Sequence, residues 1–144
     1  MNASQWMDHA RKEIGICEIA GIKHTDRIIQ YHACTGLRAR TDETPWCASF
    51  ICWVLSQAGI YHPRSAAAHA FLAWGDEIYT PRYGAVAILE RGPGLAHVTF
   101  VYSDTPKTIN GLGGNQGNRV GVVPFSKDKL LGYRWPKAEY FNAG

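Results

Sequence analysis

Cys47 holds the position in this sequence that best suits a nucleophile. It follows Thr44, a good helix N-cap, and Pro45, whose missing N–H and fixed φ cost nothing at the first position of a helix. The sequence therefore predicts a helix that begins at Pro45 and carries Cys47 in its first turn. The positive end of the helix dipole lies there, and it favours a thiolate over a thiol.

The residues after Cys47 predict a well-anchored helix. An apolar stripe recurs at helical spacing, and Gly59 ends the pattern. Cys52 lies in the middle of this helix, off the Cys47 face, and is interpreted as a packing residue. Cys17 and Cys34 have no activating pattern nearby. The stripe consists of Phe50, Ile51, Val54, Leu55 and Ala58.

A thiolate nucleophile needs a base, normally a histidine, and His97 is the candidate. It lies within a predicted strand, Leu95 to Tyr102, which is the rigid kind of element that a precise site favours. The other histidines fall on helices or loops and are interpreted as surface or locally bonded residues. They are His9, His24, His32, His62 and His69.

A third polar group must orient the imidazole. Asn115 and Gln116 follow a predicted strand that can pair beside the His97 strand, and the neighbouring glycines allow a sharp turn there. Asp104 is a weaker candidate in the preceding loop. The backbone N–H of Cys47, left free at the helix start, would stabilise an oxyanion.

Helical periodicity dominates the first half of the chain and strand alternation the second. This order predicts a single α+β domain over residues 1–144, with N-terminal helices packed on a C-terminal antiparallel sheet. Three further helices are predicted at Ser4–Ile14, from Thr25, and from Ser65 to Trp74. The predicted strands are Gly84–Glu90, Leu95–Tyr102, Thr108–Leu112, Val120–Val123 and Leu131–Trp135.

Composition excludes several classes of function. With 46% hydrophobic and 19% charged residues, the chain is an ordinary globular domain. Its net charge of +3 is scattered, which argues against nucleic-acid binding but suits a polyanionic cell envelope. The first residues do not resemble a signal peptide, and no segment matches a membrane span, so synthesis in a cytoplasm with reduced cysteines is expected.

The linked order of four motifs resembles the CHAP family of cysteine, histidine-dependent amidohydrolases/peptidases. The motifs are Pro-Trp-Cys-Ala-Ser-Phe, Gly-Ala-Val-Ala, Ala-His-Val and Gly-Gly-Asn-Gln, within about Glu13 to Trp135. The resemblance implies a papain-like fold with Cys47 as nucleophile, His97 as base and Asn115 as their polar partner. Many members carry a carboxylate two residues before that asparagine. Here the position is Gly113, which leaves Gln116 or a distant acid such as Glu43 as alternatives.

The resemblance implies an enzyme that cuts an amide bond of bacterial peptidoglycan, and we expect it to be a monomer without a metal or cofactor. It would be a cysteine endopeptidase or an N-acetylmuramoyl-L-alanine amidase that acts on the cell wall. A phage endolysin that lyses the host is the favoured type, and an injected effector with an immunity partner is the alternative. Rival hypotheses are a zinc amidase built on His24, His32 and Cys34, a wall-binding module, and a glycosidase with paired carboxylates.

Overall fold

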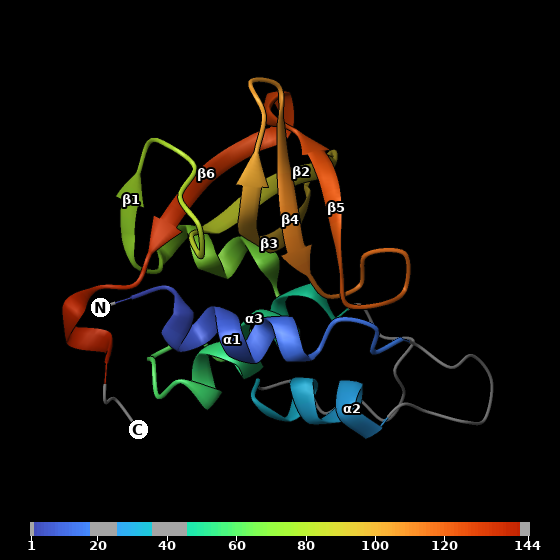
Figure 1. Cartoon of the computed structure of the whole chain (residues 1–144), viewed down its shortest axis with the longest axis vertical. Helices are drawn as coiled ribbons and strands as arrows, with labels where there is room; N and C mark the ends of the chain where they lie inside the picture. Colours follow the sequence, from blue (N-terminus) through green and yellow to red (C-terminus); the bar gives the residue numbers. More distant parts are fainter. Residues whose placement is uncertain (1, 18–25, 36–45, 142–144) are drawn as a thin grey trace.

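The computed structural model describes residues 2–17, 26–35 and 46–141. Within these ranges three α-helices come first: α1 (Ser4–Lys12), α2 (Asp26–Ala33) and α3 (Cys47–Gln57). An antiparallel sheet follows, and Figure 1 shows the three helices gathered on one side of it. The predicted α+β arrangement is therefore confirmed.

In the sheet, the strands from β2 to β5 lie side by side in sequence order, and β6 returns to lie between β1 and β2. The spatial order of the strands is β1-β6-β2-β3-β4-β5, and every neighbouring pair is antiparallel. The central strand β3 thus lies between β2 and β4. The strands are β1 (Asp76–Ile78), β2 (Val86–Gly92), β3 (Leu95–Asp104), β4 (Thr108–Gly113), β5 (Gly121–Ser126) and β6 (Leu130–Trp135).

Helix α3 is the central element of the core. Every residue from Cys47 to Leu55 is buried, as expected for a helix enclosed on all sides. The helix begins at Cys47 with Trp46 in the N-cap position, two residues later than predicted; Thr44 and Pro45 lie outside the described residues. No helix in the described part of the chain is long and apolar enough to cross a membrane.

Strand β3 contributes side chains to two separate apolar clusters. Val98 and Phe100 face the helices and join the main core with α3. Val101 belongs to a smaller cluster on the other face of the sheet. Ile78 of β1 and Phe125 of β5, which lie on opposite edge strands, both pack against this second cluster. The sheet is therefore strongly curved around it.

Two local predictions are wrong, and one short strand has no prediction. Helix α1 ends at Lys12, which leaves Ile14 49% exposed instead of on the buried face. The predicted α-helix from Ser65 is a 3-10 helix at Ala68–Ala73, because the Ser65 hydroxyl accepts a bond from the Ala67 N–H, 3.0 Å away, in a local turn. Strand β1 was not predicted, because three residues carry too little periodicity to detect.

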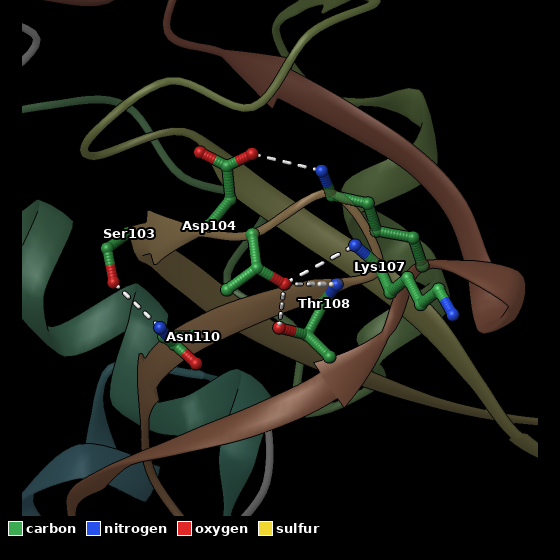
Figure 2. A network of polar contacts seen from close by, with 7 residues as sticks. Ser103, Asp104, Lys107, Thr108 and Asn110 are labelled. Carbon is green, nitrogen blue, oxygen red and sulfur yellow. Dashed lines mark hydrogen bonds and ion pairs between the residues drawn. The ribbon is translucent and has the colours of Figure 1, made fainter.

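Polar side chains fasten the turn between β3 and β4 to the segment before β6. Figure 2 shows the polar contacts around this turn, with Ser103, Asp104, Lys107, Thr108 and Asn110 labelled. The Lys127 ammonium lies 2.9 Å from Asp104 Oδ2, and the Lys127 N–H donates to the Lys107 carbonyl at 2.9 Å. These contacts hold a short 3-10 helix, η2 (Lys127–Lys129), against the β3–β4 hairpin.

The turn after β4 packs directly against α3 because Gly114 has no side chain. A methyl group at this position should therefore destabilise the fold. A Cβ on Gly114 would lie 2.6 Å from the Trp46 ring and 2.7 Å from the Phe50 Cβ. We expect Gly114→Ala to lower the free energy of unfolding by about 1–3 kcal/mol, measured by chemical denaturation.

Gly121→Ala is the matched control, because its Cβ would meet nothing closer than the Arg119 Cγ at 3.9 Å. We expect it to change the free energy of unfolding by less than about 1 kcal/mol. Equal losses in the two variants would contradict the close contact between the turn and α3.

Candidate active site

The Cys47 sulfur lies where the start of α3 meets an open edge of β3. Strand β3 pairs with β2 from Leu95 to Phe100, whereas its pairing with β4 begins only at Phe100. The first half of β3 therefore has one edge that β4 leaves uncovered. Cys47 is only 6% exposed there, and the backbone N–H groups of Val98 on β3 and of Ala48 act on its sulfur to lower the pKa of the thiol.

The pKa of the Cys47 thiol is raised, which corrects the expectation from the helix start. Burial is the largest effect and disfavours the thiolate. The N–H groups of Val98 and Ala48, and the positive charge of Arg91, lower the pKa but do not cancel the effect of burial. The sequence revealed the helix start but not the depth at which the sulfur lies.

His97 lies on β3 immediately before Val98, whose backbone N–H lowers the pKa of the Cys47 thiol. His97 is 6% exposed, and its ring packs on Phe125 with centroids 5.2 Å apart. Its Nε2 lies 3.0 Å from Oε1 of Gln116. The position of the ring is therefore fixed by an aromatic contact and by a polar one.

The surroundings of Gln116 determine which nitrogen of His97 carries the proton. The Gln116 Nε2 group donates to the Gly111 carbonyl at 2.9 Å and to the Gly121 carbonyl at 2.8 Å. The amide oxygen, which can only accept, therefore faces the imidazole. His97 Nε2 must then be the donor, and Nδ1 is left as the basic nitrogen of the neutral ring.

The pKa of His97 is lowered. Burial of the imidazole is the largest cause, because it disfavours the charged form. The hydrogen bond with Gln116 acts in the opposite direction, and the nearby charge of Arg91 lowers the pKa further. His97 is therefore neutral, and able to accept a proton, at pH 7 and somewhat below.

Asn115 lies next to the polar contact but is not the side chain that makes it. Its backbone has φ 58°, a left-handed turn conformation, and the residue is half-buried beside a pocket that His97 also lines. The hydrogen bond to the imidazole comes from Gln116, which the sequence left open as an alternative. A catalytic role for Asn115 stays a prediction.

Gly113 explains how the site accommodates Gln116. A Cβ on Gly113 would lie 2.5 Å from Gln116 Oε1 and 2.6 Å from the Thr99 hydroxyl. A carboxylate-bearing side chain at this position would therefore collide with the amide that contacts His97. Gln116 can therefore reach the imidazole only because position 113 carries no side chain.

The remaining candidates lie elsewhere. Glu43 and His24 fall outside the described residues. The Asp104 carboxylate pairs with Lys127 at the far end of β3. His32 is 1% exposed and contacts the Ser49 hydroxyl at 2.7 Å, within the α2–α3 interface. Over the described ranges, no three His, Cys, Asp or Glu side chains gather closely enough to hold a metal ion.

Comparison with known families gives a match to the CHAP domain. The model of the CHAP domain matches residues 39–115, more than half of the chain, and the match includes both Cys47 and His97. The chain belongs to the CHAP family. No curated protein sequence matches it.

Membership of the CHAP family places the activity among the cysteine, histidine-dependent amidohydrolases and peptidases that act on peptidoglycan. The observed architecture, helices followed by a six-stranded antiparallel sheet, agrees with a papain-like CHAP domain. The match ends at Asn115, one residue before the side chain that contacts His97.

Substitution of Asn115 and of Gln116 tests which of the two side chains orients His97. The sequence predicts Asn115, whereas the geometry favours Gln116. We expect Gln116→Ala to lower kcat on peptidoglycan by about 10- to 100-fold, because the imidazole loses the bond that fixes its tautomer. Asn115→Ala should change kcat by less than about threefold. The reverse ranking in steady-state assays would assign the orienting role to Asn115.

Proposed function

We propose that the protein hydrolyses an amide bond of bacterial peptidoglycan with Cys47 as nucleophile, His97 as general base and Gln116 as the residue that orients the base. One observation carries this proposal: Gln116 fixes His97 in the Nε2–H tautomer, one residue along β3 from Val98, whose N–H lowers the pKa of the Cys47 thiol. Membership of the CHAP family supports peptidoglycan as the substrate.

The reaction is an acyl transfer through a thioester. His97 Nδ1 takes the proton from Cys47 as the sulfur attacks the carbonyl carbon of the scissile amide. The backbone N–H of Cys47, in the first turn of α3, stabilises the negative charge that develops on the carbonyl oxygen. The amine then leaves with the proton from His97, and a water molecule activated by His97 hydrolyses the thioester.

The pKa shifts indicate that the pair rests uncharged. Burial raises the pKa of Cys47 and lowers that of His97, which favours a neutral thiol and a neutral imidazole before substrate binds. Proton transfer then accompanies nucleophilic attack instead of preceding it. A neutral amide on His97, in place of a carboxylate, is consistent with this resting state, because it stabilises an imidazolium less strongly.

The proposed biological role is that of a phage endolysin, which is made in the host cytoplasm and degrades the cell wall when the membrane is breached. The modest positive charge of the chain, +3, supports this role because it favours contact with a polyanionic wall. The bond that is cut would be a sugar–alanine amide, a stem-peptide bond or a cross-bridge, and mass spectrometry of the released muropeptides would identify it.

Removal of the Cys47 thiol tests the proposed chemistry. We expect Cys47→Ala to reduce solubilisation of purified peptidoglycan by at least about 1,000-fold, because it removes the sulfur that forms the thioester. The variant should retain the circular dichroism spectrum and unfolding transition of the parent. Expressed in a bacterial cytoplasm, the parent should lyse cells after membrane permeabilisation, and Cys47→Ala should not.

Cys34→Ser is the matched control for loss of a thiol. Cys34 follows α2, and its sulfur contacts the Ser56 hydroxyl at 3.6 Å, outside the proposed site. This variant should keep peptidoglycan hydrolysis within about threefold of the parent. Hydrolysis that survives Cys47→Ala would rule out a cysteine mechanism at this position.

A further inference from the structure

A pocket of about 270 Å³ opens beside His97 and has a charged rim. His97 and Gln116 form part of its lining, so it is continuous with the proposed catalytic site. Its described lining also includes two cations, Arg91 and Lys129, and one carboxylate, Glu90. The pocket is therefore positive overall where a substrate would approach the base.

A β-bulge brings Arg91 to this pocket. In the β2–β3 hairpin, Glu90 pairs with Ala96 and Gly92 pairs with Leu95, so Arg91 is an extra residue without a partner on β3. A bulge re-aims side chains and is common beside active sites. Here the bulged residue, Arg91, lines the pocket together with Glu90 before it.

Arg91 is available to a ligand and is close to the reacting groups. It is exposed, and its guanidinium forms no ion pair with any residue in the described part of the chain. It lines the same pocket as His97, and its charge lowers the pKa of both Cys47 and His97. An anion bound to Arg91 would therefore lie in the same pocket as the imidazole of His97.

Lys129 adds a second positive charge from a separate element. It is the last residue of η2, which the Lys127–Asp104 ion pair and the Lys127–Lys107 backbone bond fasten to the β3–β4 hairpin. Lys129 is exposed and forms no ion pair with a described residue. The two cations thus reach the pocket from independently anchored positions.

We propose that this pocket binds a free carboxylate of the peptidoglycan stem peptide, held by Arg91 and assisted by Lys129, and so selects substrates with a carboxylate close to the scissile amide. This inference rests on the proposed function. A planar guanidinium can bind both oxygens of a carboxylate, whereas a carboxamide offers no charge and only one acceptor. Amidated stem peptides would therefore be poor substrates.

The test uses one set of soluble muropeptides in two forms: with free stem carboxylates, and after coupling to ammonia, which converts these groups to carboxamides. We expect the parent enzyme to cleave the free-acid form with a kcat/KM about 10- to 100-fold higher, as is typical for a charge-assisted contact. Arg91→Gln should reduce this preference to within about twofold, and Lys129→Gln should reduce it partly.

Arg11→Gln is the matched control, because it removes one positive charge from an exposed position on α1, outside the pocket. It should leave the preference unchanged. The preference is a ratio measured within each variant, so a slower Cys47 reaction in Arg91→Gln does not affect it. A parent enzyme that cleaves both forms equally, or an Arg91→Gln variant that keeps the full preference, would overturn the proposed carboxylate site.

A binding experiment separates this inference from the proposed function. Cys47→Ala protein, which performs no turnover, should bind the free-acid muropeptides at least about tenfold more tightly than the amidated ones, measured by calorimetric titration. Equal affinities would overturn the carboxylate site even if hydrolysis requires Cys47. Failure of the parent to cleave either form would instead contradict the proposed function.

Discussion

The three hydrogen bonds of the Gln116 side chain are the interactions on which the proposed chemistry depends. Two of them join the amide nitrogen to carbonyls of β4 and β5, and the third joins the amide oxygen to His97 on β3. One buried side chain therefore ties three strands together and fixes an imidazole tautomer. Because the amide cannot turn over without losing two bonds, the orientation of the imidazole is set by the fold.

The pKa of the Cys47 thiol results from opposing effects. Helix α3 is buried along almost its whole length, and its first residue places a sulfur against the uncovered edge of β3. The helix start and Arg91 favour a thiolate, whereas burial opposes it and has the larger effect. The proposed activation thus relies on His97 as base more than on a thiol that is ionised in advance.

Much of this arrangement could be predicted from the sequence. The Cys47 helix, the His97 strand and the α+β order follow from periodicity and turn residues, which are local signals. The depth of the sulfur could not be predicted, because burial depends on how α3 packs against β3. The identity of the orienting amide could not be decided either, since Asn115 and Gln116 are adjacent and the left-handed backbone of Asn115 determines which side chain reaches His97.

The central claim is that Gln116 holds His97 as a neutral imidazole protonated on Nε2. Nitrogen-15 NMR of the imidazole at pH 7 measures this directly, with His97 assigned by its absence in a His97→Gln variant. The account predicts a protonated Nε2 and an unprotonated Nδ1, because Gln116 Oε1 accepts from the ring and burial lowers the pKa of His97. A ring protonated on Nδ1, or on both nitrogens, would contradict it.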